Sequence, residues 1–261
     1  MNYKISIFLM LMGLFLIMPS GTTSCQLNIV GSTSVQPVCE ELVNEYKKTH
    51  DDVDINVQGG GSNLGIKCTD NCLADIGMSS KEVNESNLNE YKIGVEGIAV
   101  VVNPSNPIND LSTSQVRDIF SGNIADWNEI SNYSGKINVI VREEGSGTLD
   151  TFKCSIMNRC EIKEDAVVQN SAGAVKQIVA EDKNAIGFVS LAHLDDNLKD
   201  IGIDNVRISQ NAILNGSYKL QRPFVLLTDK NPDNETSRFI NWTLSSESSK
   251  IFEKENLIKI D

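Results

Sequence analysis

The sequence predicts an α/β fold built around a mainly parallel sheet, and two observations support this prediction. Short apolar runs of strand length alternate with amphipathic helical patterns for most of the 261 residues, which is typical of successive strand–helix units. Turns rich in glycine, serine and threonine follow several of the apolar runs, at the point where a strand would lead into a helix. The share of apolar residues, 40%, is that of a globular protein.

The first half of the chain shows this alternation clearly. Residues 27–31 (LNIVG) are predicted to form a buried strand, and residues 35–48 an amphipathic helix. Residues 53–57 and 74–80 are the next strands, and the second of them ends in two serines. A strongly β-branched strand follows at 97–104, where an Asn-Pro pair should stop it.

The second half of the chain continues with further helices and strands. A helix at 112–122 opens with a capping box from Ser112 to Gln115 and closes on Gly122. Strands are predicted at 137–141, 184–191 and 222–228, and helices at 172–181 and from about 235 to 252.

The first 24 residues have the order of a secretory signal peptide. An apolar run from Ile5 to Met18 follows a single lysine and precedes small polar residues, and it is shorter than the roughly 20 residues that span a membrane. Cys25 closes this segment in a sequence similar to the lipobox of lipoproteins. We therefore expect an exported chain, at the cell surface or in a periplasm-like space, with a lipid anchor on Cys25. The alternative is cleavage near Ser24 and a freely soluble product.

Six cysteines in an exported chain suggest disulfide bonds. Their spacing predicts two short local bridges, Cys68–Cys72 and Cys154–Cys160. Cys39 falls in the first turn of the helix that follows the first strand, and we expect it to be a buried free thiol. No metal site is expected, because no pair has the C-x₂-C spacing and the chain has only two histidines.

The formal net charge of −12 disfavours nucleic acids and anionic membrane surfaces as partners. Three turns nevertheless have the composition of an anion site: GSTS at 31–34, GGGS at 59–62 and GSGT at 145–148. Because the carboxyl ends of parallel strands meet at one crevice, the hydroxyls and amides of these turns should converge. With Arg142 as the one cation beside them, they predict a site for a small tetrahedral oxyanion.

The residue pattern of these turns disfavours both a nucleotide-binding P-loop and a serine nucleophile. A P-loop would need a lysine where Ile66 stands. A serine nucleophile at Ser146 is not expected, because Glu144 breaks the G-x-S-x-G pattern, and His50 and His193 are both expected at the surface. The sequence therefore predicts a binding protein rather than an enzyme.

The ordered set of motifs resembles the phosphate-binding proteins of ABC phosphate importers, a branch of the type II periplasmic binding proteins. The resemblance covers essentially the whole mature chain. It is carried by GSTSVQP, VQGGGSNLGI, ADIGMSS, LSTSQVRDIFSGNIADWNEI, VIVREEGSGTLDTF and NAIGFVSL, in the family's order and approximate spacing.

The resemblance implies a ligand set for inorganic phosphate and no cofactor. The implied contacts are Thr33, Ser34, Ser62, Ser80, Arg142, Ser146, Gly147 and Thr148, with Ser79 and Glu144 in support. Glu144 stands where relatives have an acidic residue that orients the arginine. Ser80 departs from the family, because many relatives have an aspartate there that is thought to accept the proton of the bound phosphate.

The resemblance also implies two α/β lobes that close over a ligand cleft between them. We place lobe one at 26–102 plus 204–261 and lobe two at 103–203. The expected partner is the permease of an ABC transporter, and the expected oligomeric state is a monomer. The alternative function is that of a surface oxyanion-binding protein, for example for sulfate, with a role in sensing or adhesion.

Overall fold

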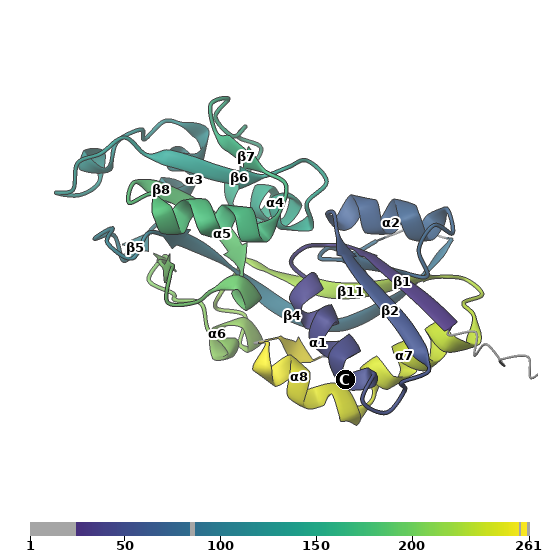
Figure 1. The fold of residues 1–261 in the computed structure, drawn as a ribbon. Coiled ribbons are helices and arrows are strands. Elements are labelled where there is room, and N and C mark those ends of the chain that lie inside the picture. The colour runs from purple at the N-terminus through teal and green to yellow at the C-terminus, as the bar shows by residue number, and fades with distance from the viewer. Residues whose placement is uncertain (1–24, 84–86, 256, 260–261) are drawn as a thin grey trace, which may run out of the picture.

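The chain folds into two α/β lobes that share one ten-stranded sheet (Figure 1). The computed structural model describes residues 25–83, 87–255 and 257–259. The predicted signal peptide, residues 1–24, lies outside the described residues. In the part of the chain that is described, no helix is both long enough and apolar enough to cross a membrane.

The bounds of the elements follow the predicted order of strands and helices. The strands are β1 (Cys25–Gly31), β2 (Val53–Gly59), β3 (Ile76–Ser79), β4 (Leu88–Val102), β5 (Asp110–Leu111), β6 (Asn138–Arg142), β7 (Val167–Gln169), β8 (Ala185–Ser190), β9 (Lys199–Asp200), β10 (Gly202–Ile203), β11 (Gln221–Asp229) and β12 (Ile258–Lys259). The α-helices are α1 (Gln36–Tyr46), α2 (Ser62–Asp70), α3 (Thr113–Ser121), α4 (Gly147–Phe152), α5 (Ala172–Glu181), α6 (Gln210–Leu214), α7 (Asn234–Leu244) and α8 (Ser249–Lys254). Short helical turns of other types are η1 (Trp127–Glu129), η2 (Lys153–Met157), η3 (Leu191–His193) and η4 (Ser246–Ser248).

The sheet runs in the order β2-β1-β3-β11-β4-β8-β6-β7. β1 is parallel to β2 and β3 in one lobe, and β6 is parallel to β7 and β8 in the other. The predicted parallel arrangement is therefore confirmed within each lobe. Between these groups lie β11 and β4, which are antiparallel to each other and to their outer neighbours β3 and β8.

The long strand β4 forms the first crossover between the lobes. Its first part, from Leu88 to Gly97, pairs with β11, and its last part, from Ile98 to Val102, pairs with β8. Only the last part has the apolar, β-branched sequence that predicts a strand, because charged residues such as Glu90, Lys92 and Glu96 interrupt the first part.

The lobe boundaries defined by the packing of the core differ from the predicted boundaries at 103 and 204. The core of lobe two begins at Ile98 and also includes Ala212, Ile213, Tyr218 and Leu220. Residues up to 220 therefore pack with lobe two, and the chain returns to lobe one at β11. The boundary was misplaced because the return is itself a strand in the middle of the sheet, with no linker to mark it.

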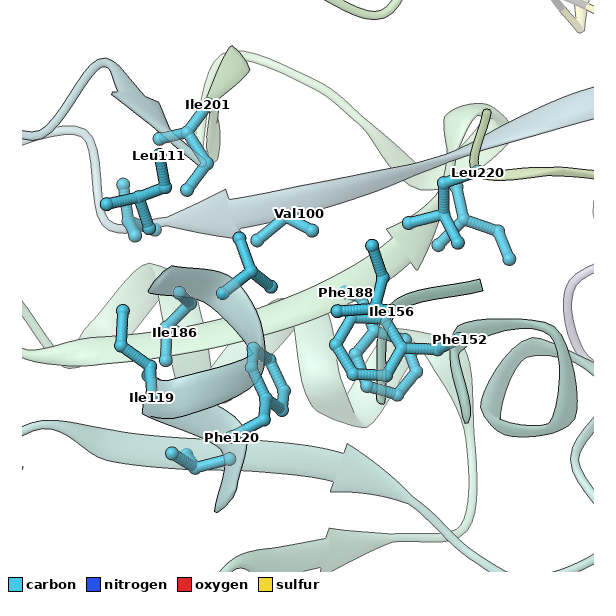
Figure 2. Packing of buried hydrophobic residues seen from close by; sticks show 14 of the residues in the cluster. Val100, Leu111, Ile119, Phe120, Phe152, Ile156, Ile186, Phe188, Ile201 and Leu220 are labelled. Atoms are coloured by element: carbon cyan, nitrogen blue, oxygen red, sulfur yellow. The ribbon is translucent and has the colours of Figure 1, made fainter. Parts of the chain in front are cut away.

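Each lobe has its own apolar core, and the core of lobe two fixes one of the predicted turns. Phe152 of α4 stacks on Phe188 of β8, with ring centroids 4.3 Å apart (Figure 2). Phe120 of α3 lies against Phe152 from another side. Because α4 follows the turn at 145–148 directly, this aromatic packing holds that turn at the edge of the sheet.

The helix termini confirm one prediction and correct another. Ser112 and Gln115 form the predicted capping box at the start of α3, and Gly122 closes that helix in the left-handed conformation. The single helix predicted from 235 to 252 is instead divided into α7 and α8. Ser245 ends α7 in an extended conformation, and its hydroxyl accepts the Glu247 N–H of the turn that follows.

The predicted disulfide bonds are not formed in the structure. Cys68, Cys72, Cys154 and Cys160 are free thiols. The Cys72 thiol instead points to Asp229 of β11, with Sγ 3.6 Å from Oδ2. The Cys154–Cys160 segment contains two residues in the left-handed conformation, Asn158 and Arg159, and both cysteines are exposed. Cys39 is a buried free thiol, as predicted.

Candidate functional site

The three predicted turns converge at the carboxyl ends of their strands. The turn at 31–34 follows β1, the turn at 59–62 follows β2, and Ser80 follows β3, all in lobe one. The turn at 145–148 follows β6 in lobe two. β1, β2 and β3 run parallel, so their carboxyl ends lie at the same edge of the sheet.

Hydroxyl groups from both lobes form one connected cluster at this place. Ser34 Oγ and Thr148 Oγ1 lie 3.1 Å apart across the cleft. On the lobe-one side Ser80 Oγ is 3.2 Å from Ser62 Oγ and receives a hydrogen bond of 3.1 Å from the Ser32 hydroxyl. All five side chains are buried. We call Ser32, Ser34, Ser62, Ser80 and Thr148 the hydroxyl cluster.

Gly147 brings the backbone of lobe two against this cluster. A Cβ atom at this position would lie 2.5 Å from Ser80 Oγ and 2.8 Å from Ser62 Oγ, far inside van der Waals contact. Any side chain here would therefore push the two lobes apart. The glycine lets the start of α4 approach the serines of lobe one directly.

Sequence reasoning missed Ser32, a member of the cluster, and also Arg222, a buried residue whose side chain contacts the cluster. Arg222 lies near the start of β11, and its Nη1 donates to Ser80 Oγ at 3.0 Å and to Thr148 Oγ1 at 2.5 Å. Its Nε and Nη2 both donate to Glu96 Oε1, at 3.0 and 2.6 Å. Both side chains of this ion pair are 1% exposed. Arg222 and Glu96 are direct cross-strand partners of β11 and β4, a register that no local sequence pattern indicates.

Arg142 is buried beside the site, but its partner is not the predicted one. Its Nε and Nη2 donate to Glu143, at 2.9 and 3.0 Å. Glu144, which the resemblance assigned to this role, instead pairs with Lys153 at 2.5 Å and leaves 78% of its side chain exposed. The two neighbouring glutamates point in different directions at the strand end, and only Glu143 reaches the guanidinium. Arg142 is nevertheless buried, because only 2% of its side chain is exposed.

Three further predicted residues bond to groups outside the hydroxyl cluster. The Thr33 hydroxyl accepts the N–H of Ala172, the first residue of α5 in lobe two. Ser146 Oγ accepts the Leu149 N–H and caps α4. Among the described residues, Ser79 Oγ bonds only to the backbone of Lys81, so it supports the turn after β3 and lies outside the hydroxyl cluster.

The two lobes are in direct contact around the cluster. The Asn63 N–H donates to the Gly145 carbonyl at 3.2 Å. Lys81 and Asp150 form an ion pair of 2.6 Å whose side chains are about one-third exposed or less. Together with the Thr33–Ala172 bond, these contacts hold the two lobes together, so the cleft between them is closed.

A polar groove of about 490 Å³ lies beside the closed cluster. Its lining residues come from both lobes: Thr33, Gln36, Gly59, Gly60, Glu143, Asn170 and Ser171. Thr33 is next to Ser34 in the chain, so the groove lies near the cluster, but none of the five cluster residues lines it.

His193 corrects the expectation of a surface histidine. It lies in η3, directly after β8, and its Nδ1 is buried without a hydrogen-bond partner in the described structure. Burial lowers the pKa of this imidazole to about 4, and the positive charges of Lys176, Arg222 and Arg142 contribute to that lowering. His193 is therefore neutral at pH 7, beside two buried guanidinium groups.

The chemistry of the cluster is that of an anion site. The cluster offers neutral hydroxyls, and the adjacent Arg222 adds the N–H groups of a buried guanidinium. Such donors match the oxygens of a tetrahedral oxyanion, and they act at short range in a place that excludes water.

Comparison with known proteins agrees with the class that the fold and the site define, a two-lobed binding protein of the type II periplasmic-binding-protein fold. The model of the PBP superfamily domain matches residues 18–247. The chain therefore belongs to the PBP superfamily.

The chain is also similar in sequence and structure to individual phosphate-binding proteins. The chain is 30% identical over 204 residues to the phosphate-binding protein PstS of Bacillus subtilis, which covers 76% of this chain and 68% of that protein. A crystal structure titled as a putative phosphate ABC transporter substrate-binding protein with bound phosphate, from Clostridium perfringens, is 34% identical and covers 90% of this chain and all of that chain, with a TM-score of 0.87. An ABC-type phosphate transport receptor from Vibrio cholerae is 30% identical over the same shares, with a TM-score of 0.73.

Proposed function

We propose that this chain captures inorganic phosphate outside the cytoplasm and delivers it to the permease of an ABC importer. The observation that carries the proposal is the buried cluster of hydroxyls from both lobes, joined by Arg222. The names of the Bacillus subtilis and Clostridium perfringens relatives support phosphate as the ligand.

The site binds an anion by exchanging hydrogen bonds. In the closed structure the hydroxyls of Ser34, Ser62, Ser80 and Thr148 bond to one another. Phosphate replaces these weak neutral pairs with charge-assisted bonds, which are roughly twice as strong. Because the ligand oxygens then join donors of lobe one to donors of lobe two, binding favours the closed cleft.

The acidity of the protein does not prevent anion capture. Bonds from hydroxyls and amides act over about 3 Å, whereas distant surface carboxylates are screened over a Debye length of roughly 8 Å. Two nearby carboxylates, Glu96 and Glu143, are each bound to an arginine. Neither of these two carboxylates is therefore free to repel a bound anion.

The predicted export and lipid anchor fit this function. Cys25 begins β1, and the hydroxyl cluster lies beyond Gly31 at the opposite end of the same strand. We infer that a lipid on Cys25 would hold the chain at the membrane surface and leave the cleft accessible. The permease then receives the ligand from a binding protein that is already beside it.

Isothermal titration calorimetry tests the proposed function. The purified mature protein should bind phosphate one to one in the presence of EDTA, because the donors are all protein groups. Sulfate titrated in parallel tests the alternative of a general oxyanion-binding protein. No heat with phosphate, together with clear binding of sulfate, an amino acid or a sugar, would overturn the proposal.

A further inference from the structure

Two buried arginines lie at the site, and their hydrogen bonds separate their roles. The Nε and Nη2 of Arg142 donate to Glu143, which lines the groove at the cleft mouth. Arg222 also gives Nε and Nη2 to a carboxylate, but its Nη1 donates to two hydroxyls of the cluster. Arg222 is thus the arginine whose bonds reach the place where the hydroxyls converge.

The position of Arg222 in the fold joins the two halves of the site. Its two hydroxyl partners come from different lobes, Ser80 from lobe one and Thr148 from lobe two. Arg222 itself lies on β11 at the crossover, beside the part of β4 that passes between the lobes. It therefore lies where the two lobes join and contacts a residue of each.

Glu96 partly neutralises the positive charge of Arg222. Its Oε1 accepts two bonds from Arg222, and its Oε2 accepts the hydroxyl of Ser190 at the end of β8. With both side chains 1% exposed, water screens neither group. Glu96 therefore competes with a bound anion for the same guanidinium.

We propose that Arg222 is a cation that binds the oxyanion and that Glu96, its cross-strand partner, sets the strength of that binding. This proposal rests on the proposed function. It adds one residue that supplies positive charge and another that weakens the attraction between that charge and the ligand. Removal of the Glu96 charge should leave Arg222 uncompensated in the free protein and let the anion take its place as counterion. Stability without ligand should therefore fall while affinity for phosphate rises, which a purely structural ion pair would not produce.

The experiment is a set of phosphate titrations by calorimetry, with thermal unfolding measured with and without phosphate. Glu96→Gln should lower the melting temperature without ligand and tighten phosphate binding by roughly tenfold. Arg222→Gln alone leaves a buried unpaired carboxylate and can unfold the chain. The double variant E96Q/R222Q avoids this, keeps a polar pair of similar shape, and should weaken phosphate binding by about ten- to a hundredfold.

The control is the pair Arg207–Asp200, which is more exposed and lies in lobe two. R207Q/D200N should leave phosphate binding unchanged. If the wild type binds phosphate and E96Q/R222Q binds it equally well while folded, the role of Arg222 is refuted and the proposed function stands. If Glu96→Gln is destabilised without any gain in affinity, the role of Glu96 is refuted. A folded wild type that does not bind phosphate overturns the proposed function and this inference with it.

Discussion

Ser80 is the residue at which this site departs from the pattern of its relatives, and its contacts define what it can offer a ligand. Its oxygen accepts hydrogen bonds from Arg222 Nη1 and from the Ser32 hydroxyl. Its own proton is then free to be donated, either to Ser62 or to a bound anion. In this arrangement Ser80 serves phosphate and sulfate alike, because both anions accept hydrogen bonds.

Ser80→Asp should raise the preference for phosphate over sulfate. A carboxylate only accepts, so it favours an anion that brings a proton and repels one that has none. Arg222, 3.0 Å from the present hydroxyl, would keep that carboxylate ionised. Competition titrations measure the ratio of the two affinities.

The matched control for this change is Ser80→Asn, which has a similar shape without the charge. It should leave the ratio of phosphate to sulfate affinity nearer to that of the wild type. An unchanged ratio in Ser80→Asp, with a wild type that already excludes sulfate, would place the proton acceptor elsewhere in the cleft. Glu82 and Glu144 are poor candidates for that acceptor, because their side chains are 59% and 78% exposed and pair with Lys92 and Lys153.

Among single residues, those in the turns were predictable from sequence and Arg222 was not. Ser34, Ser62 and Thr148 fall in glycine-containing turns directly after apolar strands, a pattern that itself suggests convergence. Arg222 is 142 positions from Ser80, and its role depends on where β11 enters the sheet. Glu143 and Glu144 are adjacent in the sequence, so only the direction of their side chains could tell them apart.

At the scale of elements, helices and strands with strong local sequence signals were predicted more accurately than those with mixed signals. The capping box and glycine of α3 fixed both of its ends, and α5 spans the predicted residues 172–181. The first part of β4 escaped prediction because its stability comes from pairing with β11 rather than from an apolar sequence. The break between α7 and α8 depends on Ser245, whose side chain favours a turn in a segment with helical periodicity.

His193, in the turn η3, leads us to expect that the stability of the protein depends on pH. The folded pKa of His193, about 4, lies below its ordinary value of 6.5, because the imidazole is buried near Lys176, Arg222 and Arg142. As pH falls, the unfolded chain binds a proton first, so the folded state is fully favoured above pH 6.5 and loses stability as pH falls toward 4. Between about pH 7.5 and about pH 5 this loss is on the order of 2 kcal/mol.

Urea unfolding of the wild type and of His193→Gln at these two pH values measures the effect. The variant lacks the titrating group, so its free energy of unfolding should fall less as the pH is lowered. The carboxylates are common to both proteins, and their contribution cancels in the comparison. Equal losses in both proteins would show that His193 has no lowered pKa in the folded state.

At the scale of the whole molecule, the two lobes and the site follow from one sheet. β1, β2 and β3 deliver their turns from lobe one, β6 delivers its turn from lobe two, and β4 and β11 join the lobes and carry Glu96 and Arg222. The family resemblance predicted the two lobes correctly. It could not place the second crossover, because residues 204–220 have no linker composition and are assigned to lobe two only by packing.

The most direct test of this account is a crystal structure of the protein grown with phosphate. We expect one tetrahedral anion within hydrogen-bonding distance of the hydroxyls of Ser34, Ser62, Ser80 and Thr148, with Arg222 Nη1 donating to it while Nε and Nη2 stay on Glu96. A phosphate bound in the groove away from these hydroxyls, or a cluster that remains bonded to itself at saturating phosphate, would contradict the central claim.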